Sequence, residues 1–521
     1  MSQETTVSES APRLRAFGAG RRPSVFDRSQ WLPDGVPAIK AELLSGLVVA
    51  LALIPEAISF SIIAGVDPTV GLYASFTIAI LISFTGGRPG MISAATGAMA
   101  LVIVDLVADH GIGFLFAATI LAGVLQIIFG WLRIGALMSL VPRTVMVGFV
   151  NSLAILIFLA QVPHILLSEA GPGFSLATNL VFIAAGLGII YGLPRLTTAV
   201  PSPLVAIAAL AVVTIGFGVE LPTVGDMGEL PDALPWVALP EVPFTVETFM
   251  IILPFSITLA LVGILESLLT AQLLDDMTDT VSDKNLESRG QGVANVVTGF
   301  FGGMAGCAMI GQSMINFRSG GRTRLSTLAS GVFLLVLILA LGDLVAQIPL
   351  AALVAVMIMV SIGTFDWSSI KPDMLRSLPV TETVVMAATV AIVVITHNLA
   401  FGVGAGIVLS AVFFVRKVSD VVRVTSVVDP DGALRLFAVS GELFFGSTGE
   451  LVHAFDYDSV QVSRVEIDLS NARIWDSSSV VALDTVVARF AERDIEATLV
   501  GLNPHAERLH RQTSGKVGSG H

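Results

Sequence analysis

The sequence predicts a polytopic all-α membrane domain followed by a small α/β domain. Of 521 residues, 54% are hydrophobic and only 13% are charged, whereas soluble domains carry about 25% charged residues. The mean hydropathy is +0.85. Apolar runs of about 20 residues, each long enough to span a bilayer, recur from Leu43 to Phe414. The polar, arginine-containing residues 1–40 are expected to form a cytoplasmic tail without a cleavable signal peptide.

Fourteen spans are predicted within residues 41–418. They form two sets of seven, in repeats of about 41–217 and 250–418, joined by an acidic loop at 218–247. Because seven is odd, the second set is inverted in the membrane relative to the first, as in many secondary transporters. The expected spans are 42–61, 68–85, 93–108, 112–131, 136–160, 175–192 and 202–217, then 250–273, 286–303, 310–318, 323–341, 345–364, 381–396 and 399–418.

Charged residues set the predicted orientation. Loop 218–247 has six acidic residues and no Lys or Arg, whereas the basic residues between the spans fall in or beside the even-numbered loops. Because Lys and Arg gather in cytoplasmic loops, both termini are predicted to be cytoplasmic. The net charge of −13 argues against nucleic acid as a partner. The single Cys307 excludes an intramolecular disulfide and by itself is no metal site.

Two stretches of small residues interrupt corresponding spans of the repeats, at 91–100 and 302–313. A short helix that begins partway through a bilayer has free N–H groups in its first turn, and these groups attract anions. The alternative is a close crossing of helices through small residues, without a ligand. We expect one anion site between the N-termini of short helices 3 and 10, with the binding residues Thr96, Gly97, Ala98, Gly311, Gln312 and Ser313.

Two carboxylates lie deep within corresponding spans, Glu56 near the end of span 1 and Glu266 in the middle of span 8. Charged groups inside a membrane are costly and usually functional, although a helix end that reaches the interface is an alternative for Glu56. A carboxylate beside a bound anion would repel it unless protonated, so anion and proton would bind together. Both glutamates are therefore candidates for substrate binding and proton coupling. Thr270 shares a helix face with Glu266, which would alternatively suit a sodium ion.

Composition changes after Arg416-Lys417. Residues 419–432 are predicted to be a linker, and residues 433–521 to be a small α/β domain with strands near 434–439, 465–469 and 497–500. Helices are expected at 479–489 and 504–510. Asp476 and the serines after it are good helix caps, and Ser478 is also a candidate for regulatory phosphorylation.

Several motifs resemble the SulP anion transporter family, the bacterial branch of solute carrier family 26. The matching segments are 54–57, 64–68, 71–73, 96–100, 290–295, 302–303 and 319–323, and the C-terminal domain resembles a STAS domain through Asp468 and Asp476-Ser477-Ser478. The resemblance implies an elevator-type transporter, often a homodimer. Its core domain would contain spans 1–4 and 8–11, its gate domain spans 5–7 and 12–14, and the anion would lie between spans 3 and 10.

Three positions depart from the family pattern. The family usually has Gln where this chain has Glu56, which adds an ionisable group. Sodium-coupled bicarbonate relatives have Thr at the position of Ile310, and many animal relatives have Ser-Arg in place of Gly311-Gln312. Without that arginine, anion binding must depend on backbone N–H groups and hydroxyls.

The predicted function is secondary active transport of a small anion of the sulfate, bicarbonate or dicarboxylate class, with proton symport across the cytoplasmic membrane. The alternatives are sodium–bicarbonate symport, a nucleobase transporter of the same fold, an uncoupled anion channel or motor, and a signalling protein whose output is the STAS domain. No cofactor is expected, and no nucleophile–base or metal-ligand spacing indicates an enzyme. The expected partners are the anion, a proton, the lipid bilayer, a second copy of the chain and a cytoplasmic protein at the STAS domain.

The orientation is testable with single cysteines placed at Gly228 and Gly432. We expect them to react with impermeant thiol reagents from opposite sides of the membrane, because the first lies in the acidic loop and the second beyond the last span. Reaction of both positions from the same side in intact cells would show that the topology is wrong.

Overall fold

The computed structural model describes residues 27–33, 35–133, 135, 141–166, 175–197, 201–231, 233–429 and 434–514. Residues 1–26 of the predicted tail and Gly432 of the predicted linker lie outside the described residues. The chain divides into two compact units. The first is drawn from residues 1–141, 149–367 and 393–400, and the second from residues 142–148, 368–392 and 401–521.

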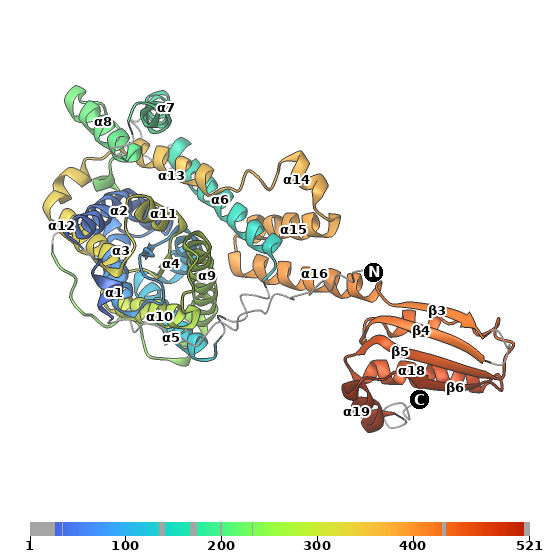
Figure 1. Ribbon diagram of the computed structural model, residues 1–521. Coiled ribbons are helices and arrows are strands. Elements are labelled where there is room, and N and C mark those ends of the chain that lie inside the picture. The colour runs from blue at the N-terminus through green and yellow to red at the C-terminus, as the bar shows by residue number, and fades with distance from the viewer. Residues whose placement is uncertain are drawn as a thin grey trace, which may run out of the picture. The chain divides into compact units, whose positions relative to one another are not determined.

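The described residues of the first half of the chain form helices, short 3-10 turns, loops and one short strand (Figure 1). Its elements are α1 (Arg28–Trp31), α2 (Val36–Ile63), α3 (Pro68–Thr85), β1 (Ser93–Ala95), α4 (Gly97–His110), α5 (Ile112–Trp131), α6 (Arg143–Leu166), α7 (Leu176–Gly192), the 3-10 turn η2 (Leu193–Arg195) and α8 (Ser202–Phe217).

The second half repeats this pattern after a 3-10 turn, η3 (Val224–Asp226). Its membrane-domain elements are α9 (Val246–Thr278), α10 (Lys284–Phe300), β2 (Gly306–Ala308), α11 (Ile310–Arg318), α12 (Arg324–Ala346), α13 (Leu350–Thr364), α14 (Pro372–Ser377), α15 (Val380–Thr396) and α16 (Leu399–Ser419).

Among the described residues, eight helices are long and apolar enough to cross a membrane: α2, α3, α5, α6, α7 with η2, α9, α12 and α16. Three shorter helices, α8, α13 and α15, are also apolar. The remaining predicted spans correspond to α4, α10 and α11, and the total of fourteen crossings stays a prediction.

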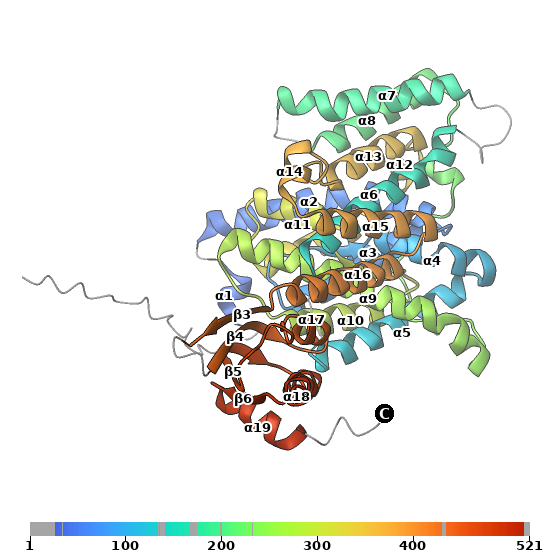
Figure 2. The same cartoon turned by 90° about the vertical axis from the view of Figure 1, so that its right-hand side faces the viewer.

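Helices of the first unit pack through small residues. Helix α5 lies against α10, and α2 and α3 lie against α12 (Figure 1). A Cβ on Gly123 would come within 2.6 Å of the Gly292 carbonyl oxygen, and a Cβ on Gly292 within 2.5 Å of the Gly123 oxygen. Only glycine permits this approach, which is typical of packing between membrane helices. Helices α7, α8 and α13 form a further packed group (Figure 2).

The predicted short helix 3 was wrong at its start. Residues 93–95 form strand β1, which pairs antiparallel with β2, so that Ser93 faces Ala308 and Ala95 faces Gly306. The helix begins only at Gly97. The physical reason is that an extended segment inside a bilayer needs partners for its backbone groups, and a second extended segment supplies them.

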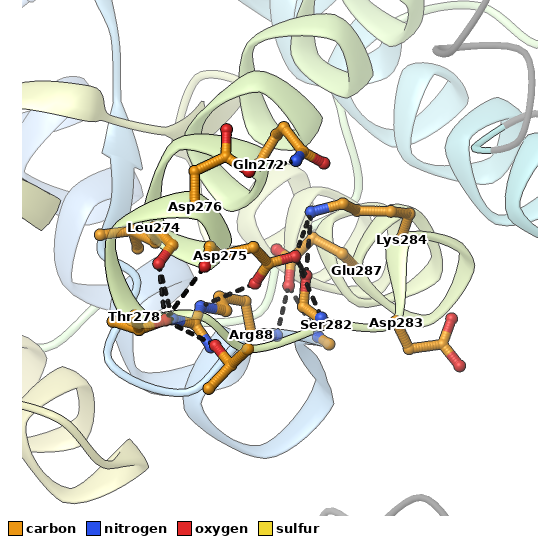
Figure 3. A network of polar contacts seen from close by, with 12 residues as sticks. Arg88, Gln272, Leu274, Asp275, Asp276, Thr278, Ser282, Asp283, Lys284 and Glu287 are labelled. Carbon is orange, nitrogen blue, oxygen red and sulfur yellow. Dashed lines mark hydrogen bonds and ion pairs between the residues drawn. The ribbon is translucent and has the colours of Figure 1, made fainter. Parts of the chain in front are cut away.

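The end of α9 is fixed by a network of charges and hydroxyls (Figure 3). Asp275, which is 6% exposed, accepts hydrogen bonds from the Lys284 ammonium at 2.7 Å and from the Ser282 hydroxyl at 2.8 Å. Its other oxygen lies 3.3 Å from the Arg88 guanidinium. Arg88 also donates to the carbonyl oxygen of Leu274 at 3.2 Å. The loop before β1 is thereby attached to the C-terminal turn of α9.

The second unit ends in a four-stranded sheet of order β3-β4-β5-β6, in which β3 is antiparallel to β4 and the other pairs are parallel. Helix α18 covers one face of the sheet (Figure 1). The elements are β3 (Arg423–Val428), β4 (Leu434–Leu443), α17 (Thr448–His453), β5 (Arg464–Ile474), α18 (Ser477–Ala491), β6 (Glu496–Val500) and α19 (Pro504–Thr513).

The predicted linker at 419–432 was wrong, because β3 occupies its centre. The run of valines and a threonine in β3 favours a strand, and pairing with β4 adds it to the sheet as an edge. Helix α17 was also missed. The other predicted strands and helices of this domain are confirmed, with longer bounds.

The network in Figure 3 predicts the effect of removing one charge. Asp275→Asn leaves Arg88 and Lys284 without their buried counter-ion, so we expect it to lower the free energy of unfolding by about 3 kcal/mol. The neighbouring Asp276 is exposed and bonds only to Gln272 among the contacts in Figure 3. Asp276→Asn should therefore change stability by less than about 0.5 kcal/mol. Equilibrium unfolding of both full-length variants in detergent measures the difference, and equal effects would contradict this role of Asp275.

Candidate functional site

The two short strands form the centre of the candidate site. Their outer backbone groups are bound by side chains from neighbouring helices. Asn295 of α10 donates to the Gly306 carbonyl at 3.0 Å and accepts from the Gly306 N–H at 2.9 Å. The Ser267 hydroxyl accepts from the Ala308 N–H at 3.1 Å, and the Ser75 hydroxyl from the Ala95 N–H at 3.3 Å. Side chains therefore bind backbone groups on both edges of the strand pair.

The start of α4 is closed. Thr96 is its N-cap and accepts from the Met99 N–H at 3.4 Å. A Cβ on Gly97 would lie 2.9 Å from the Phe60 ring and 3.2 Å from Ile157. Ala98 is fully buried. Thr96, Gly97 and Ala98 lie together as predicted, but side chains cover this helix start.

The start of α11 is open by comparison. Met309 precedes it in an extended conformation and provides no side-chain cap. Gly311 is exposed, and a Cβ there would meet nothing within 4 Å. The first-turn N–H groups of α11 therefore form the better anion site of the two. The Ser313 hydroxyl is already used, because it accepts from the Ile92 N–H at 3.0 Å and so ties α11 to the chain before β1.

Both predicted carboxylates are buried beside this centre. Glu56 is 6% exposed and accepts a short hydrogen bond from the side-chain amide of Gln312. Glu266 is 9% exposed and accepts a hydrogen bond from the Cys307 thiol at 2.9 Å. One glutamate comes from each repeat, and both bind the segment that runs from Cys307 to Gln312. Burial within the protein does not decide the depth of Glu56 in the membrane, so both interpretations of Glu56 stay predictions.

The register of the strands keeps the two helix starts apart. Because β1 and β2 are antiparallel, α4 and α11 leave the strand pair at opposite ends. Glu56 contacts the α11 end through Gln312, and Glu266 contacts the α4 end through Cys307, whose sulfur lies 3.2 Å from the Thr96 hydroxyl. Each carboxylate is thus associated with a different helix start.

Thr270 does not complete a cation site in this structure. Its hydroxyl donates to the backbone carbonyl of Glu266 at 2.8 Å, one turn earlier in α9. The Glu266 carboxylate already accepts a thiol proton. The two side chains share a helix face, as predicted, but their oxygens do not converge.

Sequence reasoning missed Cys307, Ser267 and Gln126 as parts of the site, and gave Asn295 no role beyond a motif match. Gln126 of α5 accepts from Asn295 at 2.8 Å. The available signal was the presence of polar residues on otherwise apolar helices that border the small-residue segments. That signal could not show which of them would meet.

Two further charged residues lie outside this centre. Arg324 belongs to the basic cluster at 318–324. This residue is 2% exposed and donates to the carbonyl oxygens of Ser83 at 2.9 Å and Gly86 at 2.7 Å, where α3 ends. Asp105 lines a cavity of about 620 Å³ beside the C-terminal end of α2 and the middle of α4, and neither glutamate lines it.

The STAS candidate Ser478 is exposed in the first turn of α18. Capping is carried out by its neighbour Asp476, which accepts from the Ser479 N–H at 3.0 Å. A hydroxyl that caps nothing and faces solvent is free to be modified, and phosphorylation of Ser478 stays a prediction. Hydrogen bonds from Ser470 lower the pKa of Asp468 below its usual value.

The difference between the helix starts predicts contrasting glycine substitutions. Gly97→Ala should destabilise the protein by roughly 1–3 kcal/mol, because its methyl group collides with Phe60 and Ile157. Gly311→Ala should leave stability unchanged or raise it by up to about 1 kcal/mol, because alanine favours the helix and meets no atom. Unfolding of both variants in detergent distinguishes the two positions. An equal loss in Gly311→Ala would mean that the start of α11 is not open.

Comparison with known proteins identifies both parts of the chain. Residues 39–389 match the sulfate permease family, and residues 425–515 match the STAS domain. The chain is 57% identical to the putative sulfate transporter YbaR of Bacillus subtilis over 485 residues, which cover 93% of this chain and 98% of that protein. It is 27% identical to the bicarbonate transporter BicA of Picosynechococcus over 511 residues, or 89% of this chain and 88% of that one.

Solved structures agree with this fold. The transmembrane domain of a cyanobacterial bicarbonate transporter, BicA, matches 71% of this chain and 98% of its own, with 28% identity and a TM-score of 0.62. The murine anion transporter Slc26a9 in its inward-facing state matches 93% of this chain and 88% of its own with a TM-score of 0.78, and at 14% identity it supports the fold alone. The chain belongs to the sulfate permease family of anion transporters.

Proposed function

We propose that this chain is a proton-coupled symporter for a small anion of the sulfate, bicarbonate or dicarboxylate class. One observation supports the proposal most strongly: the buried carboxylates of Glu56 and Glu266, one from each repeat, both bind the segment that leads into α11. The names of the sulfate and bicarbonate relatives favour a small oxyanion. The open first turn of α11 offers it N–H donors.

In this proposal, charge repulsion couples the binding of the anion to the binding of a proton. Two unit charges about 6 Å apart repel by roughly 3 kcal/mol at an effective dielectric constant of about 20. An anion bound between the starts of α4 and α11 would meet such repulsion from an ionised Glu56 at the α11 end or an ionised Glu266 at the α4 end. Protonation removes it, so anion and proton bind better together than separately. By linkage, anion affinity then rises as the pH falls.

The proposed transport cycle is of the elevator type, with α2–α5 and α9–α12 as the moving core. The short helices that carry the anion belong to this core and to both repeats. Ile157 of α6, a predicted gate helix, covers the start of α4. Movement of the core past α6 would uncover it. We further propose a homodimer in the cytoplasmic membrane, with both termini in the cytoplasm.

Sodium coupling is the main alternative within transport. The position of Ile310 lacks the hydroxyl of sodium-coupled relatives, and the Thr270 hydroxyl is bonded to its own helix. Both features favour a proton over a sodium ion. For the STAS domain we propose a regulatory role, through Ser478 or a protein partner, because the candidate site lies wholly in the first unit.

The proposed coupling predicts that glutamine substitutions of the two glutamates affect anion exchange and anion accumulation differently. Glu266→Gln and Glu56→Gln keep the side-chain shape but cannot gain or lose a proton as a carboxyl group does. We expect each to retain anion exchange while at least one of them loses uptake driven by a proton gradient. Proteoliposomes loaded with sulfate, bicarbonate or a dicarboxylate, with and without a proton or sodium gradient, measure both activities. The exposed Asp276→Asn on the same helix as Glu266 is the matched control and should accumulate normally.

Full proton-driven accumulation in the Glu56→Gln, Glu266→Gln double variant would contradict the proposal. Accumulation driven by sodium alone would favour the alternative. Passive flux without accumulation in the wild type would indicate a channel. Loss of transport without residues 430–521, in a protein that still folds, would favour a role of the STAS domain in the transport step itself.

A further inference from the structure

Three buried side chains form a continuous hydrogen-bond chain from α9 to the start of α4. Glu266 accepts from the Cys307 thiol at 2.9 Å, and the Cys307 sulfur lies 3.2 Å from the Thr96 hydroxyl. Thr96 is 2% exposed and Cys307 fully buried. This series of hydrogen bonds crosses β2. It links the carboxylate of Glu266, from the second repeat, to the start of α4, from the first repeat.

Proton counting fixes the direction of this chain when Glu266 is ionised. A carboxylate only accepts, so the single thiol proton of Cys307 must point to Glu266. The contact between Cys307 and Thr96 then requires the Thr96 hydroxyl to donate to sulfur. Thr96 also accepts from the Met99 N–H. With Glu266 ionised, the Thr96 proton is therefore occupied and unavailable to an anion.

Protonation of Glu266 permits the opposite direction. Its new O–H donates to the Cys307 sulfur, the thiol turns to donate to Thr96, and the Thr96 proton is released. No heavy atom has to move. The only covalent change is the O–H bond that Glu266 forms with its proton. We propose that Cys307 is a positioning residue that reports the protonation state of Glu266 to Thr96. Once movement of the core uncovers the start of α4, Thr96 then donates to the anion only when Glu266 holds a proton. This inference rests on the proposed proton-coupled transport.

The strand that carries Cys307 is well suited to such a relay. The residues on either side of Cys307 are fixed by Asn295, which binds Gly306, and by Ser267, which binds Ala308. The sulfur is thereby held between its two partners while its S–H bond can still rotate. A thiol both donates and accepts, whereas alanine does neither.

Other charged groups on α9 and the elements packed against it form no hydrogen bond to Glu266 among the described residues. The elements packed against it are α4, α5, α10, α11 and β2, and α5 carries no titratable residue. Asp275 binds Arg88 and Lys284, and Glu287 accepts from the backbone of Gly87 and Arg88. The remaining charged or titratable groups on α9 and these elements, none hydrogen-bonded to Glu266, are Asp105, Asp109, His110, Glu247, Asp276, Arg289 and Arg318.

The S–H stretching vibration tests the relay directly. Cys307 is the only cysteine, so the full-length protein has a single S–H infrared band. Hydrogen bonding to a carboxylate lowers the frequency of this band more than bonding to a hydroxyl. We expect the band to move to higher frequency on acidification in the wild type and in Glu56→Gln. In Glu266→Gln we expect no movement.

Transport provides the second measurement. The probes are radiolabelled sulfate and bicarbonate, each assayed in proteoliposomes over a range of pH. Cys307→Ala should reduce the gain in uptake on acidification about tenfold, the effect of a hydrogen bond to a charged group. Cys307→Ser keeps a donor and acceptor and should restore most of that gain. The matched control is Asp276→Asn, which alters an exposed residue on the same helix as Glu266 and should keep the pH response.

The outcomes separate the relay from the proposed function. A band that does not move with pH, or that still moves in Glu266→Gln, would overturn the relay, as would an unchanged pH response in Cys307→Ala. If the wild type shows no proton-driven uptake, the proposed function fails. A band shift that depends on Glu266 would still support the relay in that case.

Discussion

The structure depends on the need to satisfy backbone groups where two spans are interrupted inside the membrane. Strands β1 and β2 satisfy backbone groups of this kind by pairing with each other over three residue pairs. A two-stranded ribbon still has open edges, and lipid cannot bind them. Asn295, Ser267 and Ser75 bind backbone N–H groups on those edges with side-chain hydrogen bonds. The polar residues of α3, α9 and α10 are therefore structural requirements of the two short helices.

The pairing of β1 and β2 also determines where the two buried glutamates make their contacts. An antiparallel pair sends α4 and α11 away in opposite directions, and it brings the two glutamates to opposite sides of one short segment. Burial of a carboxylate is unfavourable unless it is hydrogen-bonded or protonated. Gln312 provides one hydrogen bond to Glu56, and Cys307 provides one to Glu266. We propose that protonation of each carboxyl group offsets the remaining cost of its burial. In the proposed mechanism, an anion that binds beside them increases this cost, and the same cost couples the anion to the proton.

Much of the fold follows from local sequence, and much of the site does not. Apolar runs predicted 112–131 and 202–217 with the observed bounds, because length and hydropathy are local properties. The strand pairing joins Ala94 to Cys307, a contact between the two halves of the chain that no local pattern reveals. Glu56 and Glu266 could be selected because charge in a membrane is rare. Their partners Gln312 and Cys307 could not, since each contact depends on how the repeats interlock.

The most direct test of proton-coupled binding is the number of protons taken up when an anion binds. Calorimetric titration of the purified, full-length protein in buffers of different ionisation enthalpy measures this number. We expect net proton uptake with the bound anion in the wild type, and none when Glu56 and Glu266 are both replaced by glutamine. Binding without proton uptake in the wild type, or the same uptake in the double variant, would show that these carboxylates do not couple the proton to the anion.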